Sequence, residues 1–244
     1  MKLSDYIDFV KKDIISFVGA GGKTTMMFKL ADELRLNNKV LVTTTTKIYL
    51  TLESTYDFIC TDKEKLPCFI NMKENGIYIV GTGINEESKI LGLEDGQLEE
   101  LATYFDYILI EADGSKEKQL KGWDEFEPVI YEKTTKTIGI IDIQSLGIVI
   151  NEDTIHRSKI FCELTGAKQG DTVKLEHLSK LVLHPKGLFK GAKGEKIIYI
   201  NKVETTKDLI LAKNLIRKIN LKNEESLSKA VIGSLSTNTY SHVK

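Results

Sequence analysis

Short apolar runs alternate with amphipathic stretches along most of this sequence. The apolar runs are rich in β-branched residues and predict buried strands at 13–18, 39–43, 56–60, 76–81, 105–111, 136–143, 196–200 and 230–235. Apolar residues at helical spacing predict helices at 3–10, 24–37, 98–104, 155–164, 175–183 and 205–219. Because strands alternate with helices, we expect a three-layer α/β/α fold in which helices cover both faces of a mostly parallel central sheet.

Two stretches of the chain show no regular period. Residues 115–127 are highly charged and include Trp123. We expect a mobile loop there, with the indole either packed against the sheet or covering a ligand. Residues 236–244 are polar and predict a frayed end. We interpret residues 1–244 as a single domain, within which 115–195 is a candidate insert that faces the substrate.

Composition and charge narrow the class of protein. Charged residues make up 28% of the chain, and the formal net charge of −1 gives no general attraction to nucleic acid or to a membrane. No apolar run approaches the roughly 20 residues of a membrane-spanning helix, and the first residues do not resemble a secretory signal. A cytoplasmic location is therefore expected. Cys60, Cys68 and Cys162 form no C-x-x-C pair, which favours reduced thiols over a disulfide or zinc site.

A glycine-rich turn follows the first predicted strand. The turn and the start of the next helix consist of Gly19, Ala20, Gly21, Gly22, Lys23, Thr24 and Thr25. Glycines allow a tight turn that presents backbone N–H groups to one anion, and the helix N-terminus adds its positive dipole end. This order predicts a nucleotide phosphate site, with Lys23 on the β- and γ-phosphates and the Thr24 hydroxyl on Mg²⁺.

The turn is shorter than the standard phosphate-binding loop. The pattern G-x-x-x-x-G-K-[ST] requires a glycine where Phe17 stands. The turn is more similar to the compact G-T-x-G-K-T-T loop of the Mur ligases than to the long loop of the GTPases. The alternative is a glycine-rich β-to-α turn with a chance lysine. The order of strand, glycines, Lys-Thr and helix favours a fold like that of the P-loop NTPases.

Threonines and a lysine follow the second predicted strand. The segment 43–47 contains four threonines and Lys47, and it falls where strands of an open α/β sheet bind ligands. A role for Thr45 or Thr46 on Mg²⁺ or the γ-phosphate is therefore expected. A plain continuation of the strand is the alternative, because threonine has a high strand propensity.

Two acids end the strand predicted at 105–111. Glu111 and Asp113 follow an apolar run and precede Gly114. This is the form of a Walker B strand, in which a carboxylate at the strand end orients Mg²⁺ or a water on it. We expect Glu111 to share Mg²⁺ with Thr24 and Asp113 to orient the attacking water. Two solvated acids at an ordinary strand exit are the alternative.

Polar pairs also occur farther along the chain. Asn201 and Lys202 follow a predicted strand and resemble the base-reading N-K-x-D motif, with Glu204 in place of the aspartate. That substitution leaves the choice between ATP and GTP open. His156 and Arg157 begin a predicted helix and could reach a phosphate or an acidic partner. A solvated pair at the helix start is the alternative.

Several of these segments occur in the order in which they occur in one known family. They are 18–25, 43–47, 111–116, 127–130, 156–157, 184–188 and 201–203. In them the chain resembles the YqeC family from residue 14 to about residue 235, and the block E-A-D-G-S-K at 111–116 is the most specific. Members of this family are described as accessory proteins of selenium-dependent molybdenum hydroxylases. The resemblance implies a nucleotide-binding role in maturing such an enzyme.

Three functions remain open from the sequence. The first is Mg²⁺-dependent hydrolysis of ATP or GTP, with Lys23, Glu111, Asp113 and Arg157 as catalytic candidates and a molybdenum hydroxylase or its maturation proteins as partners. The second is a small-molecule kinase or ligase, in which 115–127, His156 and Arg157 would line an acceptor pocket. The third is a nucleotide-gated binding module without turnover.

Overall fold

A central sheet with helices on both faces organises the molecule. The computed structural model describes residues 1–49, 53–62, 64–220 and 227–243, without the side chains of Glu53 and Cys68, so the cysteine prediction for Cys68 and the frayed-end prediction for Lys244 lie outside it. The long strands are β1 (Ile14–Gly19), β2 (Lys39–Thr44), β5 (Gly76–Val80), β7 (Tyr107–Glu111), β9 (Lys136–Asp142), β11 (Glu195–Asn201) and β12 (Lys229–Ser234). The shorter strands are β3 (Lys47–Tyr49), β4 (Phe58–Cys60), β6 (Lys89–Leu91), β8 (Leu120–Lys121), β10 (Ile155–His156) and β13 (Thr239–His242).

The strands pair almost entirely in parallel. Within the described residues, the main sheet has the order β13-β12-β11-β9-β1-β7-β2-β5-β4, and the β12–β13 pair alone is antiparallel. The register places Phe17 of β1 beside Glu111 of β7 and Ile138 of β9. The predicted fold class, a three-layer α/β architecture with a mostly parallel sheet, is confirmed.

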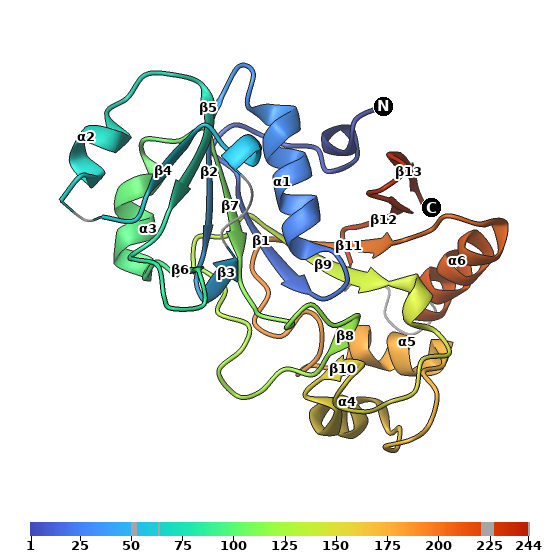
Figure 1. The fold of residues 1–244 in the computed structure, drawn as a ribbon. Coiled ribbons are helices and arrows are strands. Elements are labelled where there is room, and N and C mark those ends of the chain that lie inside the picture. The colour runs from blue at the N-terminus through green and yellow to red at the C-terminus, as the bar shows by residue number, and fades with distance from the viewer. Residues whose placement is uncertain (50–52, 63, 221–226, 244) are drawn as a thin grey trace.

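Helices on the two faces complete the three layers (Figure 1). They are α1 (Lys23–Leu34), α2 (Leu66–Ile70), α3 (Asp95–Ala102), α4 (Ser158–Thr165), α5 (Leu175–Leu183) and α6 (Thr206–Asn220), with short 3-10 helices at Leu3–Tyr6, Glu53–Thr55 and Ile143–Ser145. Met27 and Leu30 of α1 pack with Phe17 on one face. On the other face, Leu98 of α3 and Ile216 of α6 belong to two separate apolar clusters. Alternate strand residues thus bury into opposite layers.

The connections create a switch point at β1. The chain leaves β1 through α1 and enters β2 on the far side of β7, whereas the segment after β7 crosses β1 to reach β9. Ligands bind parallel sheets in the crevice that such a reversal opens at the carboxyl ends of the strands. In Figure 1 the small β8–β10 pair and α4 lie just beyond the carboxyl end of β1. The sheet therefore offers its binding edge to that region.

Two local predictions were wrong, and a third holds for most of its segment. The helix predicted at 155–164 begins at Ser158, because Arg157 has a left-handed backbone (φ 56°) and the two residues before it form β10. Thr239–His242 is paired in β13 and is not frayed. The segment 115–127, expected to be a loop, is irregular except for the two-residue strand β8, and the burial of Trp123 in the core agrees with the packing alternative for this indole. The start of α4 and the burial of Trp123 depend on segments distant in sequence, whereas β13 pairs with the preceding strand β12.

Candidate functional site

The glycine-rich turn is fixed by close packing against two strand ends. Gly21 and Gly22 have positive φ angles of 77° and 135°, which side-chain-bearing residues rarely adopt. A Cβ atom on Gly22 would lie 2.4 Å from the side-chain nitrogen Nδ2 of Asn201. A Cβ atom on Gly21 would lie 2.4 Å from Cβ of Asp142. The turn therefore needs glycine both for its backbone shape and for the space around it.

Lys23 lies beneath this turn and is almost fully buried. Its ammonium donates to the carbonyl of Gly19 at 2.7 Å and lies 3.2 Å from Oδ1 of Asp113 and 3.9 Å from Glu111. Although burial opposes it, the charges of Asp113 and Glu111 raise the pKa of Lys23. The lysine is therefore a fixed positive charge at the end of β1.

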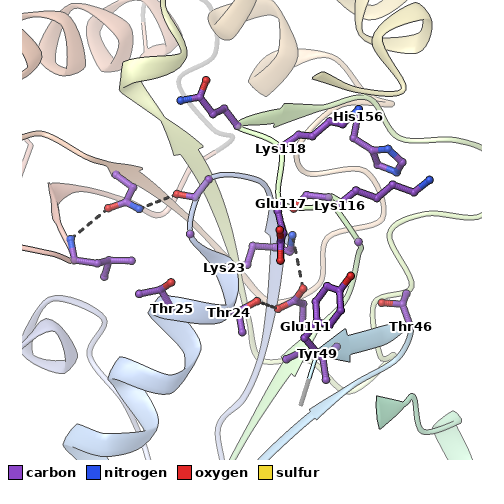
Figure 2. A pocket seen from close by; sticks show the side chains of 18 of the residues that line it. Lys23, Thr24, Thr25, Thr46, Tyr49, Glu111, Lys116, Glu117, Lys118 and His156 are labelled. Atoms are coloured by element: carbon purple, nitrogen blue, oxygen red, sulfur yellow. Dashed lines mark hydrogen bonds and ion pairs between the residues drawn. The ribbon is translucent and has the colours of Figure 1, made fainter. Parts of the chain in front are cut away.

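Thr24 and Glu111 form a pair of oxygen groups next to Lys23. The Thr24 hydroxyl donates to Oε2 of Glu111 at 2.6 Å, joining the start of α1 to the end of β7. Burial raises the pKa of Glu111, against the attraction of Lys23. Figure 2 shows Lys23, Thr24 and Glu111 side by side at the centre of the site. A hydroxyl and a carboxylate at this spacing suit a hard cation such as Mg²⁺.

Asp113 is completely buried and faces the protein interior. It accepts hydrogen bonds from the backbone N–H of Gly19 at 3.1 Å and from Nε1 of Trp123 at 2.6 Å. Burial raises its pKa, but the charges of Lys23 and Lys121 and these two donors outweigh that and lower it. Asp113 therefore stays charged while it joins the turn to the segment after β7.

A chain of buried charges continues from Asp113. The side chain of Lys121 is fully buried, and its ammonium lies 3.2 Å from Asp113 and 2.6 Å from Glu127. Glu127 also pairs with Arg157 at 2.5 Å, and Arg157 reaches Asp124 at 2.6 Å. The guanidinium of Arg157 is thus held by two acids of the same chain. These charged side chains link the glycine-rich turn to the start of α4.

The four threonines at the end of β2 differ in what their side chains contact. Thr43 donates to the carbonyl of Val80, Thr44 to that of Glu111, and Thr45 to that of Val129. These bonds tie β2 to its neighbours and to the segment after β7. Thr46 and Lys47, in contrast, face a large cavity.

Asn201 supports the glycine-rich turn from the end of β11. Its side-chain nitrogen donates to the carbonyl of Gly21 at 2.8 Å, and its oxygen accepts from the backbone N–H of Leu235 at 3.3 Å. Lys202, which has a positive φ of 61°, pairs with Asp142 at 2.6 Å. Glu204 accepts hydrogen bonds from Ser234 and Ser236. The end of β11 therefore braces the turn on the side opposite β7.

A cavity of about 1190 Å³ brings many of the predicted residues together. Of the sequence candidates, it is lined by Gly21, Gly22, Lys23, Thr24, Thr25, Thr46, Lys47, Glu111, Arg157, Asn201 and Lys202. Gly19, Ala20, Thr45 and Asp113 do not line it. Gly19 and Asp113 instead contact Lys23 from behind.

Other cavity residues were not singled out from the sequence. Tyr49 and Lys89 are such residues, whereas Glu204, His156 and the charged segment with Lys116 and Lys118, which also line the cavity, were among the sequence candidates. Lys116 ends the E-A-D-G-S-K block, which was the available signal for its neighbourhood. Tyr49 and Lys89 come together only because β3 pairs with β6, which no local pattern indicated.

The described residues contain no cluster of three or more histidine, cysteine, aspartate and glutamate side chains able to hold a metal. Mg²⁺ bound with a nucleotide needs one or two protein oxygens, since phosphates and water supply the rest. The Thr24–Glu111 pair fits that requirement.

Comparison with known proteins assigns the family. The model of the family described as "YqeC protein" matches residues 15–159, which contain the glycine-rich turn, Glu111 and Arg157. The chain belongs to the YqeC family. It is also 30% identical over 229 residues to the Escherichia coli (strain K12) protein called "Uncharacterized protein YqeC", covering 88% of this chain and 85% of that one. The YqeC likeness therefore extends past the matched segment.

The helices that the structure describes in this YqeC chain are at most 15 residues long. Among its described helices, none has both the length and the apolar character that crossing a bilayer requires.

Proposed function

We propose that this protein binds a magnesium nucleoside triphosphate in the cavity and cleaves its terminal phosphate. One observation carries the proposal: the buried ammonium of Lys23 lies below a turn of positive-φ glycines and beside the Thr24–Glu111 pair. Backbone N–H groups, a fixed cation and two oxygen groups are what a triphosphate with its cation requires.

Each residue would have a distinct task. Lys23 stays protonated and places its charge against the β- and γ-phosphates. The turn from Gly21 and the start of α1 supply backbone N–H groups. Thr24 and Glu111 would hold Mg²⁺, which neutralises charge on the phosphates when bound. Asp113 keeps Lys23 and Gly19 in place from the interior.

Glu117 is a better placed candidate than Asp113 for orienting the attacking water. Asp113 does not line the cavity, whereas Glu117 does and is exposed there. Figure 2 shows Glu117 directed towards Lys23 and Glu111. A carboxylate facing the γ-phosphate position can accept the proton of a water during hydrolysis.

The test is a calorimetric titration with ATP, GTP and CTP, each with Mg²⁺, followed by measurement of phosphate release with the tightest binder. We expect Lys23→Ala to weaken binding about 10- to 100-fold, because charge-assisted hydrogen bonds to phosphate are lost. Lys29→Ala, on the same helix but outside the cavity, should bind normally. Absence of binding by all three nucleotides would refute the proposal.

The family resemblance suggests the biological setting. We propose that nucleotide turnover serves the maturation of a molybdenum hydroxylase. Phosphate release should then increase when the purified hydroxylase, lacking its cofactor, is added to the reaction. Equal release with and without that enzyme would contradict this setting while leaving nucleotide cleavage intact.

A second function, transfer of phosphate to a small acceptor, is favoured by the size of the cavity. Its volume of about 1190 Å³ is larger than the roughly 300–1,000 Å³ of a typical small-molecule pocket. Strict dependence of nucleotide consumption on an acceptor would distinguish transfer from hydrolysis. The residues of the additional space indicate what such an acceptor would carry.

A further inference from the structure

The cavity extends beyond the residues assigned to the nucleotide. The nucleotide residues lie at 21–25, at Glu111 and at 201–204. The remaining lining includes 46–49, Lys89, 114–119, Glu152, His156 and Arg157, and we call this region the outer cavity. In Figure 2, Lys116, Lys118 and His156 lie on one side of Lys23, and Thr25 lies on the other. A nucleotide on the glycine-rich turn would leave the outer cavity beyond its terminal phosphate.

Three lysines of the outer cavity form no hydrogen bond or short ion pair in the described parts of the chain, although Lys118 attracts Glu152, and Lys47 and Lys116 attract Glu87, from farther away. No hydrogen bond or ion pair engages the ammonium groups of Lys47, Lys116 or Lys118 among those residues, whereas Lys89 pairs with Glu87 and Arg157 with Asp124 and Glu127. Unpaired cations within a cavity are available to an anionic ligand.

The backbone directs two of these lysines to the same side. Lys116 and Glu117 both have left-handed φ angles, 50° and 60°, which are uncommon for such residues. Figure 2 shows Lys116 and Lys118 directed to the side of His156, whereas Glu117 is directed towards Lys23. Strained backbone of this kind concentrates at ligand sites. The turn thus separates a cationic pair from the acid between them.

Charges around His156 indicate a positive environment. Burial, and then the charges of Arg157 and Lys121, lower the pKa of His156 to about 4, while Glu127 acts in the opposite direction. The imidazole is therefore neutral near pH 7 and can hydrogen-bond to a ligand. The acids on this side already have partners: Glu152 accepts a hydrogen bond from Ser158, and Glu127 pairs with Lys121 and Arg157.

We propose that the outer cavity binds a second ligand, a small molecule that carries a phosphate group, held by Lys116 and Lys118 with Lys47 in the same cavity. Several separate cations suit a group with several anionic oxygens. The proposal deepens the proposed function, on which it rests, because the ligand would lie beside the terminal phosphate of the bound nucleotide.

The experiment uses inorganic phosphate as the probe. Wild-type protein is first saturated with Mg²⁺ and a non-hydrolysable imido analogue of ATP, so that the nucleotide phosphate positions are filled. Phosphate is then titrated and its binding followed by broadening of its phosphorus NMR signal. The test variant is the double substitution Lys116→Ala/Lys118→Ala. Lys213→Ala, which removes an exposed lysine of α6 outside the cavity, is the control.

We expect phosphate to bind the wild type and the control equally, and the double variant about tenfold more weakly or not at all. All three proteins should bind the nucleotide analogue with the same affinity. Unchanged phosphate binding in the double variant, or none in the wild type, would overturn the proposal. Weaker analogue binding by the double variant would also overturn it, because the lysines would then contact the nucleotide itself.

Failure of the proposed function gives a different result. If the analogue does not bind at all, the titration is repeated on the protein alone. Phosphate binding that still depends on Lys116 and Lys118 would then support the outer site without a nucleotide beside it.

Discussion

The ammonium of Lys23 lies 3.2 Å from Oδ1 of Asp113, and both side chains are buried. Asp113 also pairs with Lys121, so removing its charge leaves two buried cations without this partner. We expect Asp113→Asn to lower the free energy of unfolding by about 3 to 5 kcal/mol, as when one member of a buried ion pair is removed. Urea unfolding measures this change.

The matched control for that variant is Asp124→Asn. Asp124 also pairs with a cation, Arg157, but it is one-third exposed, so its loss should cost about 0 to 1 kcal/mol. Equal unfolding midpoints for Asp113→Asn and Asp124→Asn would show that the buried charge chain contributes little.

Thr24 and Thr25 should differ in their dependence on Mg²⁺. The Thr24 hydroxyl contacts Glu111, whereas Thr25 lines the cavity without that contact. Thr24→Ala should weaken nucleotide binding about tenfold with Mg²⁺ present and little when the metal is chelated. Thr25→Ala should change nucleotide affinity by the same factor with and without Mg²⁺. Calorimetry with and without a chelator compares them, and identical behaviour would remove Thr24 from the metal site.

Gly22 and Gly114 offer a test of the turn. Gly22→Ala forces a Cβ to within 2.4 Å of Asn201 at a φ of 135°, so nucleotide binding should be lost and stability reduced by about 1 to 3 kcal/mol. Gly114→Ala meets no atom within 4 Å and should leave both unchanged. Thermal unfolding and nucleotide titration report on each. Normal binding by Gly22→Ala would mean that the turn does not hold the phosphates.

Glu117 should matter for cleavage more than for binding. Glu117→Gln keeps the size of the side chain but removes its ability to take a proton. We expect phosphate release to fall about 10²- to 10⁴-fold with nucleotide affinity retained. Glu125→Gln, in the same charged segment but outside the cavity, is the control. Full activity of Glu117→Gln would mean that another residue orients the attacking water.

The histidine of the outer cavity should affect stability at acidic pH. The pKa of His156 is lowered to about 4 from the ordinary value of 6.5, mainly by burial, so the unfolded chain binds its proton first as the pH falls. Stability from this residue is complete above pH 6.5 and decreases down to pH 4. His156→Asn should remove about 1 kcal/mol of that decrease, a figure reduced for the partial exposure of the ring. If the unfolding free energies of the wild type and His156→Asn changed in parallel from pH 4 to 7, this prediction would be contradicted.

The layered fold and the glycine-rich turn could be predicted from the sequence because both depend on local order. The run from Ile14 to Lys23 specifies strand, turn and helix without help from distant residues. The charge chain could not be predicted in this way. Lys121 reads as a solvated lysine in a charged segment, and only the pairing of β8 with β10 brings it under cover beside Asp113. The role of Asn201 likewise appears only where β11 ends beside Gly21.

The antiparallel strand β13 affects how readily copies of the protein associate through the edges of their sheets. An open parallel sheet leaves unpaired backbone groups at each edge, where another chain can add as a further strand. Thr239–His242 occupies that position along β12, and the other edge strand, β4, is only three residues long. A polar segment at one end and a short strand at the other thus discourage edge-to-edge aggregation of neighbouring copies.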